Sequence, residues 1–428
     1  MVHFWPKMGG WLGDLPDTRV QEKVIYPRAF LVWMGLMAFL MKLGSRRQIG
    51  FELDSPEALE NLNRLSGCRQ ETLAHHDTLN HFLGHVDPEA LAALRRRMVH
   101  RLLRMKVLEG ARLLGKPYLV ALDATGQLFF HQRHCSQCLE KTIDGRTYYY
   151  HNILEAKLIG PGGIVLSVGS EFIENTDPHA SKQDCELAAF RRLAPRLKKD
   201  FPQLPLCLLL DALYANGTGM GLCEDNGWHY IITFKEGSLP ALWQEYQTLQ
   251  DLCPDNRQAT TQPDGTQQSF AWVDDLEHVD DEGRAHRTGA FQCREQAPDG
   301  TTGFFAWLTD LPIRPDTVAA LGNQGGRKRW KIENEGFNTQ KNGGFNLEHA
   351  YSLGDDQIKN FYLLLQIAHM ILQLLERGSL LPADCKKLFG SIRNLAKRLA
   401  ESLRNRLIPP EALDPLAASL IQIRLRGP

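Results

Sequence analysis

Two aspartates stand directly after short apolar runs that are typical of buried strands. Asp123 follows Leu-Val-Ala-Leu, and Asp211 follows Cys-Leu-Leu-Leu. A carboxylate at the carboxyl end of a buried strand lies at the mouth of an open α/β sheet, where such folds place their chemistry. A helix N-cap or an Asx-turn is the ordinary role of one such aspartate. Two of them side by side repel unless a cation intervenes, and bare carboxylates favour Mg²⁺ or Mn²⁺.

A third acid stands in the stretch RWKIENEGFNTQK, residues 329–341, which has the composition of a helix rich in charges and aromatics. If this helix packs on the sheet, Glu333 can reach the same edge, with Arg329 one turn before it and Lys341 two turns after it. Three carboxylates for metal ions and two cations for a phosphodiester are the components of two-metal phosphoryl transfer. An ordinary surface ion pair between Arg329 and Glu333 is the alternative interpretation.

Four segments occur in a fixed order between residues 117 and 351, namely ALDATG, LLLDALYANG, YIITFKEGSLP and RWKIENEGFNTQKNGGFNLEH. Together they resemble the DDE transposases of bacterial insertion sequences, in particular the insertion-sequence-four-like group. The resemblance implies an α/β fold with an RNase H-like core. It also implies that Asp123, Asp211 and Glu333 are the catalytic residues and hold two Mg²⁺ or Mn²⁺ ions. The family places a β-rich insertion between the second aspartate and the glutamate, and this chain has the room for one there.

The same resemblance implies a DNA transposase that binds terminal inverted repeats and carries out phosphodiester hydrolysis and strand transfer. Its partners would be double-stranded terminal and target DNA, bound by a homodimer. Two positions depart from the family's Tyr-Arg-Glu-Lys signature: Gly326 replaces the tyrosine, and Gln340 replaces the lysine, with Lys341 one residue beyond. Glu335 is the alternative to Glu333 as the third acid. A catalytically inactive, transposase-derived DNA-binding protein and a nuclease without strand transfer remain the rival hypotheses.

Two further motifs each allow two interpretations. His131, His134, Cys135 and Cys138 have the ligand types and close spacing of a structural zinc site, but a polar hairpin after the Asp123 strand is the alternative. Trp307 lies in the predicted insertion, where core packing is the ordinary role of a tryptophan. In related transposases an aromatic residue of this subdomain stacks on a displaced base, so Trp307 is also a candidate DNA contact.

The elements that must position these residues can be read from the hydrophobic pattern. Residues 1–112 predict a helical, DNA-binding N-terminal region, and residues 113–235 the first part of a mixed α/β core. Residues 236–325 are polar and acidic, with turn pairs between strand-like runs, and predict the β-rich insertion. Helical patterns return from residue 327, so residues 326–380 complete the core and residues 381–428 form a basic helical region. Within the core, strands are expected at 116–126, 147–160, 162–174, 204–211 and 228–235.

The charge of the chain is nearly balanced, at −1 for 428 residues, but the charges are separated locally. Two basic segments, at 94–106 and 386–406, are candidates for contact with the phosphate backbone of DNA, although solvated helix faces are the ordinary explanation. In the first of these segments the cations are Arg95, Arg96, Arg97, Arg101, Arg104 and Lys106.

The cysteine count and the apolar runs bear on the compartment. Nine scattered cysteines do not resemble a disulfide framework, which favours a reducing compartment. The apolar run at residues 29–41 is too short to cross a bilayer, which takes about 20 residues, and predicts a buried helix. The N-terminus lacks the pattern of a signal peptide, so we expect a cytoplasmic protein without a membrane partner.

Overall fold

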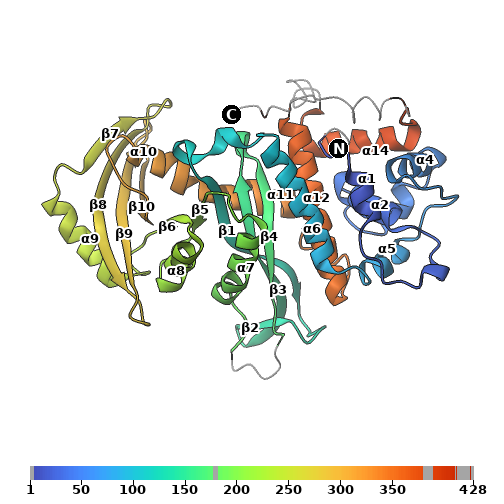
Figure 1. Cartoon of the computed structure of the whole chain (residues 1–428), viewed down its shortest axis with the longest axis horizontal. Coiled ribbons are helices and arrows are strands. Elements are labelled where there is room, and N and C mark those ends of the chain that lie inside the picture. The colour runs from blue at the N-terminus through green and yellow to red at the C-terminus, as the bar shows by residue number, and fades with distance from the viewer. Residues whose placement is uncertain (1–3, 177–181, 379–388, 410, 412–424, 426–428) are drawn as a thin grey trace.

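The computed structural model describes residues 4–176, 182–378 and 389–409, together with residues 411 and 425 (Figure 1). It is a mixed α/β structure with helices at the two ends of the chain and one open sheet between them. The N-terminal helices are α1 (Met8–Gly13), α2 (Arg28–Leu40), α3 (Gln48–Glu52), α4 (Pro56–Ser66), α5 (His76–Leu83) and α6 (Pro88–Arg104). Helix α2 is apolar on every side and buried from Ala29 to Leu40, as the sequence predicts for this run.

The central part of the sheet contains each strand that the sequence predicts for the core. These strands are β1 (Tyr118–Phe130), β3 (Arg146–Ile159), β4 (Val165–Ile173), β5 (Leu206–Leu210) and β6 (His229–Thr233). Strand β3 pairs antiparallel with β1 and with β4, whereas β5 runs parallel to both β1 and β6. A strand that the sequence analysis missed, β2 (Leu139–Ile143), pairs with the first residues of β3, and this hairpin projects from the sheet (Figure 1).

The predicted insertion extends this sheet instead of forming a sheet of its own. It contains helix α9 (Pro240–Leu252) and strands β7 (Arg257–Thr261), β8 (Gln267–Val279), β9 (Ala285–Gln296) and β10 (Thr302–Thr309). Strand β10 pairs antiparallel with β6, so that the strand order is β2-β3-β1-β5-β6-β10-β9-β8-β7. The two parts of the chain therefore share one continuous sheet, with β7–β10 at one end of the molecule (Figure 1).

Alternate side chains of β1 enter different hydrophobic clusters. Val120 and Leu122 belong to the larger cluster, which includes residues of α7 (Glu186–Asp200) and α12 (Asp355–Arg377). Leu119 and Ala121 belong to the cluster that contains Trp307 of the insertion and Phe337. Since side chains alternate between the two faces of a strand, β1 is covered on both faces. This explains why its sequence is a continuous apolar run.

The segment that carries the third acid is an irregular helix. It begins at Val318, not at residue 327 as the sequence predicts, and consists of α10 (Val318–Ala320), the π-helix η6 (Leu321–Gly325), the 3₁₀-helix η7 (Gly326–Arg329), the π-helix η8 (Ile332–Asn338) and α11 (Thr339–Asn342). A π-turn has more residues than an α-turn, so spacings counted on an α-helix do not hold along this segment.

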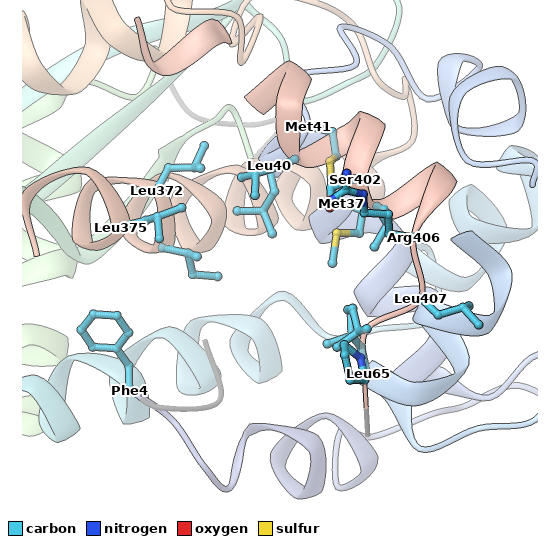
Figure 2. A pocket seen from close by; sticks show the side chains of 15 residues that line it. Phe4, Met37, Leu40, Met41, Leu65, Leu372, Leu375, Ser402, Arg406 and Leu407 are labelled. Carbon is cyan, nitrogen blue, oxygen red and sulfur yellow. The ribbon is translucent and has the colours of Figure 1, made fainter. Parts of the chain in front are cut away.

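Helix α12 is long and apolar enough to span a bilayer, but 89% of its apolar window is buried inside the protein. Such burial is typical of a core helix, and the cytoplasmic location stays a prediction. Near α12, residues of α2 and α14 (Ile392–Asn405) help to line a cavity of about 550 Å³ (Figure 2). Among its lining residues only Ser402 and Arg406 are polar or charged, so this cavity does not supply a set of groups for chemistry. The predicted basic residues Lys386 and Lys387 lie outside the described residues.

Candidate active site

The parallel pairing of β1 with β5 aligns the two strand-ending aspartates. Ala121 is the register partner of Leu209, and Asp123 and Asp211 each stand two residues further along their strands. Asp211 also acts as an N-cap, which is the ordinary role of such an aspartate. Its side chain caps the 3₁₀-turn η5 (Ala212–Tyr214) and accepts a hydrogen bond from the Leu213 amide at 2.8 Å. This cap holds the Asp211 carboxylate at the end of β5.

Asp123 is the centre of a group of interacting charges. The pKa of its carboxyl group is raised to about 6, mainly by burial and to a smaller extent by the negative charges of Asp211 and Glu333. Arg329 opposes this shift, since its Nη1 lies 3.4 Å from Asp123 Oδ2. The charges of Asp211, which follows β5, and of Glu333 on η8 thus both act on Asp123 of β1, which also pairs with Arg329.

The two glutamates of η8 have different surroundings. Glu333 is exposed, and its charge acts on Asp123. Glu335 forms an ion pair with Lys331 and lies beside Gly163, in the turn between β3 and β4. The surroundings of the two side chains thus favour Glu333 over Glu335 as the third acid, and this choice stays a prediction.

Lys341 forms an ion pair on the protein itself, and its predicted contact with phosphate stays a prediction. Its Nζ lies 2.8 Å from Glu348, and no contact among the described residues joins it to the acids. The neighbouring Gln340 is fully buried and donates hydrogen bonds to Gln366 and to His369. Because the segment between Glu333 and Lys341 is largely a π-helix, the α-helical spacing of these two residues does not set their relative position.

A fourth acid, which the sequence analysis missed, lies beside the aspartates. Glu186 is the first residue of α7, and burial together with the charges of Asp123 and Asp211 raises its pKa to about 7. Its Oε2 lies 3.4 Å from the Tyr214 hydroxyl. An acid in the first turn of a helix is ordinary, so the sequence contained no signal that could distinguish Glu186.

Trp307 is a core residue, and the alternative of base stacking is wrong for this structure. Its side chain is 3% exposed and its ring stacks between Phe291 and Phe305, at centroid distances of 5.0 and 5.9 Å. The exposed tryptophan near the acids is instead Trp330, which is 50% exposed and packs against the Arg329 guanidinium.

The predicted basic track on α6 is also corrected in part. Arg95 is buried and donates hydrogen bonds to Ser167 and Ser170 of β4, because this face of α6 packs on the sheet. Arg96 forms ion pairs with Asp200 and Glu89, at 2.8 and 3.2 Å. Arg97 is exposed and remains a candidate for contact with phosphate.

The candidate zinc ligands form a cluster of a different composition from the predicted one. His134, Cys135 and Cys138 lie together, but the fourth member is His151 of β3. His131 is exposed and its ring packs near Phe129 and Tyr148. His151, which lies 13 residues after Cys138, thus takes the place that the sequence analysis gave to His131.

The chain matches no protein-family model, and no curated protein matches it. Its function therefore has to be argued from the residues of the site and from their chemistry.

Proposed function

We propose that the protein is a metal-dependent DNA transposase of the DDE type, which cuts phosphodiester bonds and transfers the freed strand. The observation that carries this proposal is that the charges of Asp211 and Glu333, which come from two other segments of the chain, both act on Asp123. The strand order β4-β3-β1-β5-β6 supports an RNase H-like core, since three antiparallel strands are followed by two parallel ones with the first acid on the middle strand.

The carboxylates fit a hard divalent cation. They offer oxygen ligands, and the pKa of Asp123 is raised first by burial and then by the charges of Asp211 and Glu333, although Arg329 lies beside it. Asp123, Asp211 and Glu333 would hold two Mg²⁺ or Mn²⁺ ions. When bound, such ions make water a stronger nucleophile and stabilise the attacking and leaving oxygens of a phosphoryl transfer.

The remaining chemistry belongs to side chains of the protein. Arg329 holds Asp123 in position, and its planar guanidinium has further N–H groups that can donate to a phosphate oxygen. Arg97 is one exposed cation for the backbone of double-stranded DNA. The substrates would be terminal inverted repeats and target DNA, and a homodimer would bring two ends together.

Substitution of one acid tests this function. Asp123→Asn should leave binding to terminal-repeat DNA unchanged and lower Mg²⁺-dependent strand cleavage by about 10³-fold or more. Asp251→Asn is the matched control, because Asp251 is exposed on α9. Cleavage that persists in Asp123→Asn and not in the control would contradict the assignment.

A catalytically inactive DNA-binding protein is the second candidate function. It is favoured by Gly326 and by the buried Gln340, which stand where the transposase signature has tyrosine and lysine. The two candidate functions can be distinguished by incubating the protein with Mn²⁺ and a supercoiled plasmid that carries the terminal repeats. Nicking or excision supports the enzyme, and a mobility shift without strand breaks supports the binding protein. Joined DNA products then distinguish a transposase from a nuclease.

A further inference from the structure

Four soft ligands meet where the loop between β1 and β2 crosses β3. Cys138 Sγ lies 3.1 Å from His134 Nδ1 and 3.5 Å from His151 Nε2, and Cys135 Sγ lies 3.5 Å from His151 Nε2 and 3.2 Å from Cys138 Sγ. All four ligand atoms lie within 4.8 Å of one another. In a tetrahedral zinc site, bonds of about 2.3 Å to sulfur and about 2.0 Å to nitrogen place neighbouring ligand atoms about 3.3–3.8 Å apart.

The elements around the cluster hold the ligands in place. His151 is 4% exposed on β3, where its register partner on β1 is Leu128. Cys138 is fully buried at the start of β2, and its carbonyl oxygen accepts a hydrogen bond from the Asn175 side chain at 3.1 Å. The backbone N–H of Asn175 donates to the carbonyl of Gln137, also at 3.1 Å. These two hydrogen bonds from Asn175 hold the loop in place at Gln137 and Cys138 without the help of a metal ion.

A disulfide does not explain this arrangement. The two sulfur atoms are 3.2 Å apart, well beyond a bond of about 2.05 Å, and both cysteines are free. A disulfide would also leave two imidazoles packed at the cluster without a function. A polar hairpin does not explain it either, because the thiol of Cys138 and the imidazole of His151 are buried. Among the described residues, the hydrogen-bond partners of these two groups are each other and the other two ligands.

We propose that His134, Cys135, Cys138 and His151 bind one structural zinc ion. Thiolate and imidazole ligands select zinc over the hard ions that suit the carboxylates. Four protein ligands complete a tetrahedral shell, which is the arrangement of structural sites; catalytic sites keep a position open. This proposal depends on the cluster alone and stands whether or not the protein cleaves DNA.

The position of the cluster indicates what the metal would stabilise. Asn175, which bonds Cys138, also accepts a hydrogen bond from the Asp184 amide at 3.1 Å, two residues before Glu186. The zinc site would thus fix the β1–β2 loop and, through Asn175, the segment that leads into α7. Loss of the metal should destabilise this end of the sheet and disturb the position of Glu186.

The metal content of the purified full-length protein tests the proposal. We expect about one zinc per chain in the natural protein, and a loss of at least about tenfold in Cys138→Ser and in His151→Ala. His131→Ala is the matched control, since His131 is the nearby histidine that the cluster leaves out, and it should retain the metal. Equal losses in His131→Ala and His151→Ala would overturn the assignment of the fourth ligand.

Cobalt binding keeps the test decisive if the cysteine variants fail to fold. Co²⁺ added to the zinc-depleted natural protein and to His131→Ala should give the intense absorption of cobalt–thiolate bonds. Removal of zinc by a soft chelator, with Mg²⁺ in excess, should lower the Tm by several degrees, and added zinc should restore it. The proposal fails if the natural protein holds no zinc and gives no cobalt–thiolate absorption. It also fails if Cys135 and Cys138 are recovered as a disulfide after alkylation without reductant.

Discussion

At the scale of single residues, the candidate site is a place where carboxyl groups are largely buried and act on one another electrostatically. The pKa of Asp123 is raised to about 6 and that of Glu186 to about 7, in each case mainly by burial and then by neighbouring carboxylates. Arg329 is the cation that opposes this effect on Asp123. A divalent ion would neutralise the remaining charge, which links metal binding to stability.

The free energy of unfolding of the metal-free protein should therefore depend on pH. Asp123 and Glu186 bind protons more tightly in the folded protein than in the unfolded chain, where their ordinary values are 3.8 and 4.5. Stability should fall as the pH rises from about 4 to about 7, by about 2 kcal/mol for each group. Urea denaturation in a chelator measures this, and Mg²⁺ should restore more stability at pH 7.5 than at pH 5. A curve that Glu186→Gln leaves unchanged would show that this group is not responsible.

Arg95 and Arg97 are neighbours in the sequence but should respond oppositely to substitution. Arg95→Met removes a buried cation 3.9 Å from Glu155 and should lower the free energy of unfolding by about 3 kcal/mol, without a change in DNA affinity of the folded protein. Arg97→Ala should leave stability within about 0.5 kcal/mol and reduce the salt dependence of DNA binding. Chemical denaturation and binding titrations at several salt concentrations distinguish the two. A stable Arg95→Met protein with weak DNA binding would contradict this description.

At the scale of elements, the position of Arg329 and Glu333 depends on how closely their helix packs on the insertion. At Gly326, a β-carbon would lie 2.3 Å from Trp307 Nε1 and 2.5 Å from Cε2. The backbone at Gly326 is right-handed helical, a conformation that any residue could adopt, so it is contact with the indole that excludes a side chain. The glycine that departs from the transposase signature is thus explained by contact with a buried tryptophan.

Gly326→Ala should consequently damage both stability and the site. The added methyl group has to move the helix or the buried indole, which should cost about 1–3 kcal/mol and lower any strand cleavage by about tenfold or more. Gly237→Ala is the control, since a β-carbon at Gly237 meets no atom within 4 Å. Thermal unfolding and cleavage rates measure the two effects. Equal behaviour of the two variants would mean that the contact with Trp307 does not position the helix.

At the scale of the whole molecule, the insertion and the core share one sheet and one hydrophobic cluster. Leu209 of β5 and Ile231 of β6 belong to the same cluster as Phe270 of β8 and Trp307 of β10. Strand β10 continues the pairing at β6, where Leu308 is the partner of Ile232. We therefore expect these strands to unfold together and not as two independent domains.

Phe270→Ala tests this coupling. Phe270 is fully buried in the insertion, and its truncation should lower the free energy of unfolding by about 3–5 kcal/mol. Hydrogen exchange should then accelerate at the amides of β5 and β6, which lie in the core. Phe304→Ala, at a position that is 47% exposed on β10, should leave this exchange nearly unchanged. Faster exchange confined to β7–β10 in Phe270→Ala would show that the insertion is a separate unit.

The pattern of residues along the chain was sufficient to predict the core strands, the buried helix α2 and the position of the two aspartates at strand ends. The apolar runs before Asp123 and Asp211 form strands β1 and β5, and the run at 29–41 forms the buried helix α2. These features depend mainly on the periodicity of neighbouring residues, which a sequence displays directly. The role of Glu333 stays a prediction, which the action of its charge on Asp123 favours.

Only the tertiary structure decided which distant residues meet. His151 replaced His131 in the soft cluster, Arg95 turned inward against β4, and Glu186 joined the aspartates. Each of these outcomes depends on how two elements far apart in the chain pack together, and residue type alone does not specify a partner. The joining of β10 to β6 has the same cause, because any strand edge offers the same backbone groups for pairing.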